Sequence, residues 1–120
     1  LSKVQRMEAS DRIAFLFATF GPIWYRGLVR DDAKNKPVTP DTLQLILDRY
    51  EADRLYVGHT IFPEVTQFYG GKVIGVNVDN AKARKNKRNR AVLIQNGQTI
   101  LVNDEGQTLR LWSNARARYY

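Results

Sequence analysis

A chain of 120 residues is long enough for one compact domain with one core and too short for two ordinary ones. A hydrophobic content of 43% argues against wholesale disorder. The longest largely apolar run, Ile13–Phe20, is far shorter than the roughly 20 residues that span a bilayer, so we expect no transmembrane segment. The absence of cysteine excludes disulfides and thiolate metal sites and is compatible with the cytoplasm or the periplasm.

The net charge of +7 comes mainly from one segment. Six basic residues fall between positions 82 and 90, and without them the formal charge would be +1. They are Lys82, Arg84, Lys85, Lys87, Arg88 and Arg90. The basicity is therefore one local cluster and not a property of the whole chain.

The N-terminal residues 2–19 place apolar side chains among charged ones at a mostly helical spacing. This pattern predicts a helix that ends before Gly21-Pro22. The stretch has no secretory signal pattern, and the chain lacks an initiator Met. We therefore expect that processing removed an upstream segment or that the chain is a piece of a longer protein.

A second helix is predicted from residue 40 to about residue 50. Thr39 is suited to the N-cap and Pro40 to the first helical position, and apolar residues follow at spacings of three and four. The next residues, "RLYVG" at 54–58, predict a short buried strand that ends in Gly-His-Thr. Functional residues of α/β proteins often project from the carboxyl ends of strands in this way.

The remaining residues predict antiparallel strands. Residues 64–78 read as two strands joined by a hairpin turn at Gly70-Gly71, and 79–90 as a loop. Three further strands with turns at Asn96-Gly97 and Glu105-Gly106 form a β-meander, and residues 115–120 form a frayed tail. We therefore expect one α/β (α+β) domain over residues 1–120, with two main helices followed by a largely antiparallel meander.

His59 is the only histidine of the chain. It could be a metal ligand, a catalytic base, or a partly buried residue whose ring nitrogens are satisfied by neighbours. A metal site needs three or more ligands, and the chain offers no second histidine and no cysteine beside it. The residues alone therefore leave these alternatives open.

Two motifs, taken together, favour the metal-ligand role of His59 over its alternatives. "LYVGHT" followed by "VTQFYGGKVIGVNV" resembles the last metal-binding motif of the calcineurin-like metallophosphoesterases. "GPIWYRGL" is similar to the "P-x-WYRG" segment of the bacterial serine/threonine protein phosphatase-like branch of that superfamily. The resemblance covers roughly residues 20–95. It implies that the chain is the C-terminal portion of a metallophosphoesterase β-sandwich.

The resemblance also implies roles for individual residues. Members of the superfamily hold a binuclear centre of Mn, Fe or Zn, which activates a water for attack on a phosphomonoester. By this similarity His59 is a metal ligand, Gly58 is its turn residue, and Thr60 is a neighbour of the ligand. The substrate would be a phosphoprotein side chain or a small phosphoester.

Arg26, in "WYRG", is the residue that the resemblance offers for contact with the substrate phosphate, because a guanidinium group matches phosphate oxygens bidentately. The alternative is a surface ion pair with Asp31 or Asp32. Trp24 and Tyr25 are more typical of core or rim aromatics than of residues that stack on a substrate.

The chain also departs from the superfamily pattern. The D-x-H, G-D-x-x-D-R and G-N-H-E motifs are absent, and Asn77 stands where an acidic residue is usual, with Asp79 two positions on. We therefore expect the N-terminal half of the catalytic domain to lie outside this chain. The isolated chain should bind catalytic metal weakly or not at all and be inactive. Because a sheet edge and an apolar face would be left uncovered, it should self-associate or swap domains, with the first helix covering part of that face.

The alternative function is a non-catalytic basic module that binds nucleic acid or another polyanion through residues 82–90. No aromatic residues interleave with the basic ones, although single-strand binding usually needs them. The pattern favours a solvated loop over a role in steering substrate, and favours both over nucleic-acid binding.

Overall fold

The structure is a computed structural model that describes residues 2–113. Whereas the sequence suggests one domain over 1–120, the chain divides into two compact units, Leu1–Val38 and Thr39–Tyr120, which are described separately. The predicted frayed tail, 115–120, lies outside the described residues. Within those residues, no helix combines the length and apolarity needed to cross a membrane.

The first unit contains the helix α1 (Lys3–Phe17) and the short helix η1 (Ala33–Asn35). A capping box starts α1: the Gln5 N–H donates to Ser2 Oγ (3.1 Å) and the Ser2 N–H donates to Gln5 Oε1 (2.8 Å). The predicted N-terminal helix is thus confirmed. None of the residues of α1 is buried, and its expected role in covering an apolar face stays a prediction.

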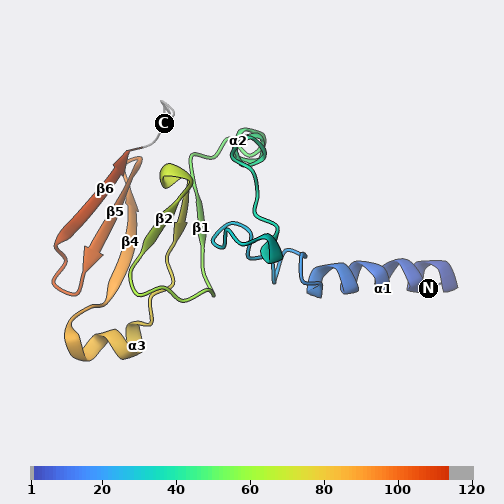
Figure 1. Cartoon of the computed structure of the whole chain (residues 1–120), viewed down its shortest axis with the longest axis horizontal. Helices are drawn as coiled ribbons and strands as arrows, with labels where there is room; N and C mark the ends of the chain where they lie inside the picture. Colours follow the sequence, from blue (N-terminus) through green and yellow to red (C-terminus); the bar gives the residue numbers. More distant parts are fainter. Residues whose placement is uncertain (1, 114–120) are drawn as a thin grey trace. The chain divides into compact units, whose positions relative to one another are not determined.

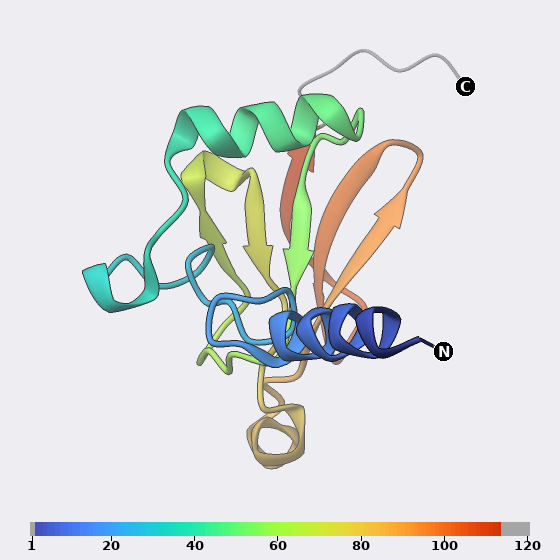
Figure 2. The same cartoon turned by 90° about the vertical axis from the view of Figure 1, so that its right-hand side faces the viewer.

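The second unit begins with α2 (Pro40–Arg49), at the position and with the cap that the sequence predicts. Thr39 Oγ1 accepts a hydrogen bond from the Thr42 N–H (3.2 Å). The helix ends where Glu51 adopts a left-handed conformation (φ 50°) and the Ala52 N–H donates to the Leu47 carbonyl (2.9 Å). Figures 1 and 2 place α2 near one end of the strands, opposite α3 (Asn80–Ala83).

Two three-stranded sheets form the rest of this unit (Figure 1). The first has the order β1-β3-β2, with β1 parallel and β2 antiparallel to β3, and the second is the antiparallel meander β4-β5-β6. The strands are β1 (Leu55–Val57), β2 (Thr66–Phe68), β3 (Val73–Gly75), β4 (Arg90–Gln95), β5 (Gln98–Asn103) and β6 (Thr108–Ser113). The α+β class and the meander are therefore confirmed.

The short strand predicted at 54–58 is present as β1, but the prediction that it is buried was wrong. β1 is an edge strand, and its Tyr56 is 37% exposed, whereas every residue of β3 is buried. The predicted hairpin between β2 and β3 is present, and its turn is the helix η2 (Tyr69–Gly71), whose three residues all have positive φ. Burial raises the pKa of the Tyr69 phenol above its usual value, because desolvation disfavours the charged form.

The core lies between the two sheets, and hydrogen bonds connect them across it. Val65, Ile74, Val78, Leu101 and Trp112 form the buried apolar cluster. The hydroxyl groups of Tyr56 on β1 and buried Thr99 on β5 share a hydrogen bond. Gln67 Oε1 on β2 accepts from Trp112 Nε1 and from the Arg110 guanidinium, both at 2.9 Å. The hydroxyl of buried Thr99 and the indole N–H of buried Trp112 are thereby satisfied.

The other face of the meander is also apolar. Leu93, Ile100 and Leu111 lie in register across β4, β5 and β6. Leu93 and Leu111 are 45% and 46% exposed. An exposed apolar sheet face is the feature from which self-association is expected, and that expectation stays a prediction.

The segment 79–90 is not the irregular loop that the sequence predicts. It contains α3, followed by the short helix η3 (Arg84–Asn86). Asp79 caps α3 by accepting a hydrogen bond from the Lys82 N–H (3.2 Å). A helix of four residues is too short to show an apolar period, so only this capping residue could have indicated it.

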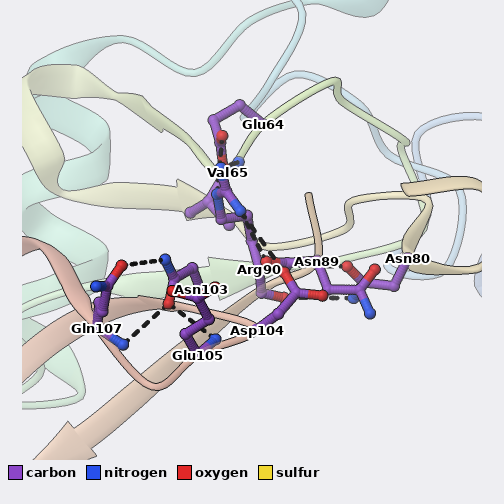
Figure 3. Close-up of polar contacts among 9 residues, drawn as sticks. All are labelled: Glu64, Val65, Asn80, Asn89, Arg90, Asn103, Asp104, Glu105 and Gln107. Carbon is purple, nitrogen blue, oxygen red and sulfur yellow. Dashed lines mark hydrogen bonds and ion pairs between the residues drawn. The ribbon is translucent and has the colours of Figure 1, made fainter. Parts of the chain in front are cut away.

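Arg90 differs from the other basic residues of this segment (Figure 3). Its side chain is 16% exposed and lies between two carboxylates, with Nε 3.0 Å from Glu64 and Nη1 4.0 Å from Asp104. Asn80 pairs with both the N–H and the carbonyl of Arg90. Arg90 is therefore part of the internal structure, and five exposed basic residues remain: Lys82, Arg84, Lys85, Lys87 and Arg88.

The substitution Gly75→Ala should destabilise the fold by about 1–3 kcal/mol, since a methyl group there would overpack β3. A Cβ at this position would lie 2.8 Å from Phe62 Cε2 and 3.3 Å from Phe68 Cε2. Gly58→Ala is the matched control, because its Cβ would meet only Asn77 Oδ1 at 3.8 Å. Urea unfolding monitored by tryptophan fluorescence measures both changes. Equal free energies of unfolding for the two variants would contradict this account of Gly75.

Candidate metal-ligand loop

The loop that carries His59 lies at the carboxyl ends of two parallel strands. β1 pairs with β3 in the register Val57↔Gly75, and the Val76 N–H extends this pairing by donating to the Val57 carbonyl (2.9 Å). Parallel strands end at the same edge of a sheet. The residues after β1, starting with Gly58, therefore lie beside the residues after β3.

His59 is at the centre of a tight turn. The Thr60 N–H donates to the Gly58 carbonyl (2.9 Å), and His59 between them has φ 72°. A hydrogen bond from residue i+2 to residue i around a central residue with positive φ is a γ-turn of the rare, strained kind. Such strain costs on the order of 1–3 kcal/mol and tends to occur at functional sites. His59 is exposed at the tip of this turn.

Asn77 holds both ends of the loop. Its side-chain Oδ1 accepts from the His59 N–H (3.0 Å), and its backbone carbonyl accepts from the Phe62 N–H (2.9 Å). A parallel bridge between Phe62 and Val78 follows directly. Asn77 thus fixes the backbone on which the imidazole is mounted, a role that the sequence did not reveal. Only its position two residues after β3, beside the loop that follows β1, could have indicated this role from the sequence.

The neighbours of His59 contribute backbone groups to the turn. Gly58 supplies the accepting carbonyl, but the positive φ that glycine would allow falls on His59 instead. Thr60 supplies the donating N–H and is half-buried. The role of Thr60 beside a metal ligand stays a prediction.

The described residues do not by themselves fit a metal centre. Among residues 2–113, no group of three or more His, Asp and Glu side chains is arranged to hold an ion. His59 is a suitable single donor, since neutral imidazole is a common ligand of Mn, Fe and Zn. Its role as a ligand therefore depends on groups other than those described.

Arg26 belongs to the first unit and lies in the segment 21–38, which follows α1. The Tyr25 hydroxyl donates to the Lys36 carbonyl (2.6 Å), and the Val38 N–H donates to the Gly27 carbonyl (3.3 Å). Gly27 is required here, because a Cβ would lie 1.9 Å from the Tyr25 hydroxyl oxygen. These contacts fix the backbone on both sides of Arg26.

The side chain of Arg26 does not form the ion pair that was its alternative role. Its guanidinium carbon lies 5.7 Å from the centroid of the Trp24 ring, and within the described residues it pairs with no carboxylate. Asp32 instead caps η1 by accepting from the backbone N–H and the side-chain amide of Asn35.

Replacing Asn77 tests the link between this residue and the turn. Asn77→Ala removes the acceptor of the His59 N–H and should lower stability by about 0.5–1.5 kcal/mol. It should also accelerate hydrogen exchange at the His59 amide, measured by NMR. Asn77→Asp is the matched control, because its carboxylate retains an acceptor oxygen. An unchanged exchange rate at His59 in Asn77→Ala would show that Asn77 does not hold the turn.

Three solved structures resemble this chain. A cold-active protein tyrosine phosphatase is 30% identical, with a TM-score of 0.63 over 91% of this chain. The cold-active protein-tyrosine phosphatase of a psychrophilic Shewanella species and a point mutant of such an enzyme are each 28% identical, with the same TM-score and coverage. The chain spans only 30 to 31% of the length of those solved chains.

No protein-family model and no curated protein matches the chain. The solved neighbours are called protein tyrosine phosphatases and not calcineurin-like metallophosphoesterases. Similarity to the calcineurin-like superfamily therefore stays a prediction. The chain is similar over nearly all of its length to one part of a larger phosphatase.

Proposed function

We propose that this chain is part of a phosphatase that hydrolyses phosphomonoesters. The observation that carries the proposal is the similarity to cold-active protein tyrosine phosphatases over 91% of the chain at 28 to 30% identity. The chain spans less than a third of those proteins, so the rest of the catalytic groups would come from sequence outside it.

We further propose that the phosphatase is metal-dependent and of the calcineurin-like type. Two divalent metals would supply an activated water and neutralise the phosphoryl oxygens. A thiolate nucleophile cannot come from this chain, because it contains no cysteine. The part assigned to this chain is to present the His59 imidazole to one metal, whose other ligands would come from sequence outside it.

The strained turn supports this role for His59. A left-handed conformation at a residue other than glycine is retained only where the surrounding structure enforces it, and here Asn77 accepts hydrogen bonds from the N–H groups of His59 and Phe62. Ligands of a metal must be held in one orientation before the metal binds. The turn places the ring of His59 at an exposed tip, where donors from another segment can meet it.

Arg26 is proposed to bind the phosphate of the substrate. The segment around it is held by the hydrogen bond from Tyr25 to Lys36, so the guanidinium is carried on an ordered backbone. Its planar donors match two phosphoryl oxygens. The substrate would be a phosphoprotein side chain or a small phosphoester.

The substitution His59→Gly in the full-length protein tests the metal-ligand role. Glycine accepts a φ of 72° without strain, so the turn should remain and stability should hold while the imidazole is lost. We expect Mn²⁺ affinity, measured by calorimetry, and hydrolysis of p-nitrophenyl phosphate each to fall by more than about 100-fold.

The control for this experiment is His59→Asn, which also tolerates the left-handed conformation and keeps a weak oxygen donor. It should unfold at the same denaturant concentration as His59→Gly and retain more Mn²⁺ binding. If His59→Gly binds Mn²⁺ as tightly as the unsubstituted protein, His59 is not a ligand. The coding sequence upstream of Leu1 should also encode the D-x-H and G-N-H-E motifs, and their absence would remove the metallophosphoesterase proposal.

Arg26→Lys should raise KM for a phosphomonoester, because an ammonium group retains the charge but not the bidentate geometry. We expect kcat/KM to fall by about 10-fold in Arg26→Lys and about 100-fold in Arg26→Ala, in line with loss of one or more charge-assisted hydrogen bonds. Steady-state kinetics on the full-length protein measures both. Arg30→Lys is the control, because Arg30 is an exposed arginine of the same unit. An equal loss in that variant would remove the special role of Arg26.

A further inference from the structure

A shallow groove of about 430 Å³ lies in the second unit, between the segment that follows His59 and the α3–η3 segment. It begins at Ile61, two residues after His59. Its lining residues are Ile61, Phe62, Pro63, Val78, Asp79, Lys82, Ala83, Asn86 and Arg88. Residues 61–63 contribute mostly apolar surface, and the segment that contains Lys82 and Arg88 contributes the basic groups.

The apolar wall is open to solvent. Ile61 is 59% exposed and Pro63 is also exposed, and the buried Val78 lines the same groove. Phe62, the one aromatic residue among the described lining residues, packs its ring against Phe68 at a centroid distance of 5.4 Å. The groove therefore offers aliphatic surface to a ligand, and its one described aromatic ring is packed against Phe68 and not presented for stacking on a base.

The fold of the basic segment brings two cations to this groove. The Arg88 N–H donates to the Ala83 carbonyl (3.0 Å), and Lys87 before it turns the chain with φ 53°. Arg88 is thereby returned to the same groove as Lys82, although six positions separate them in sequence. The other three exposed basic residues of the segment, Arg84, Lys85 and Lys87, do not line the groove.

The one carboxylate in the groove leaves the cations largely available. Asp79 caps α3 and lies 3.7 Å from Lys82 Nζ, but the Lys82 side chain is 89% exposed. An ion pair this exposed contributes little, so a ligand carboxylate can compete for the lysine. With Arg88 on the same wall, the local charge is positive.

We propose that this groove is a docking site for an acidic polypeptide segment that carries one bulky apolar side chain. The apolar side chain would lie against Ile61 and Pro63, and flanking carboxylates would pair with Lys82 and Arg88. Charge complementarity and the size of the groove carry the proposal, since about 430 Å³ suits one or two side chains. A nucleic acid fits less well, because the exposed apolar residues that line the groove, Ile61 and Pro63, are not aromatic.

This docking site does not require the proposed phosphatase function. Because the groove starts directly after the His59 turn, a polypeptide bound in it would pass close to that turn. If the proposed function also holds, the groove would favour phosphorylated polypeptides with acidic residues near the phosphorylated position. Binding can be measured without any catalytic activity, so the two proposals can fail separately.

The test uses the full chain and a fluorescein-labelled peptide in which glutamates and aspartates surround one leucine, with fluorescence anisotropy as the readout. The double variant Lys82→Ala/Arg88→Ala should weaken binding by about 10-fold or more. The control, Arg84→Ala/Lys85→Ala, removes the same charge from outside the groove and should weaken binding less than about 3-fold. Equal losses in the two double variants would show attraction to charge alone and overturn the proposal.

A second arm tests the apolar wall. Ile61→Ser should weaken binding by about 5-fold, and a peptide with serine in place of leucine should bind about equally weakly to the unsubstituted chain. The peptide with serine should also be insensitive to Ile61→Ser. A single-stranded oligonucleotide of the same charge that displaces the leucine peptide at lower concentration than the unlabelled peptide does would identify the site as nucleic-acid binding and overturn the proposal.

Discussion

The parallel pairing of β1 with β3 is the constraint on which the candidate site depends. Two strands that run in the same direction end at the same edge, and the register Val57↔Gly75 places the turn at His59 beside Asn77. The bridge from Phe62 to Val78 continues this alignment past the turn and into the groove. One backbone register therefore aligns the candidate ligand, the residue that holds its turn, and the adjacent groove.

The strain at His59 and its relief are both local. A left-handed conformation costs a side-chain-bearing residue roughly 1–2 kcal/mol, and the two hydrogen bonds of Asn77 offset a cost of that size. An asparagine serves here as well as an aspartate would, because the turn needs only an acceptor oxygen. The departure from the superfamily pattern at this position is thus compatible with an intact loop.

Much of the fold could be predicted because its signals are local. Thr39 and Pro40 mark the start of α2, and the Asn96-Gly97 turn fixes the hairpin of β4 and β5. The missed features depend on partners far away in sequence. In the sequence, Arg90 is not distinguishable from its basic neighbours, because its partner Glu64 lies 26 positions earlier. The resemblance singled out His59 and Arg26. The γ-turn and the hydrogen bond from the His59 N–H to Asn77 do not follow from residue types, because both depend on the pairing of strands 18 positions apart.

The apolar outer face of the meander has a consequence for how its strands find their register. A slip by one residue exchanges the two faces of a strand, and this is normally prevented because one face is polar. Here a slipped β5 would bury Ile100 or Val102 in the place of Leu101. The apolar area buried would therefore differ little between the native and the slipped register. The discrimination comes instead from polar atoms: Thr99 and Trp112 would lose Tyr56 and Gln67, the partners that satisfy them inside the core. In this sheet, the hydrogen bonds supply the specificity that hydrophobic patterning supplies in most others.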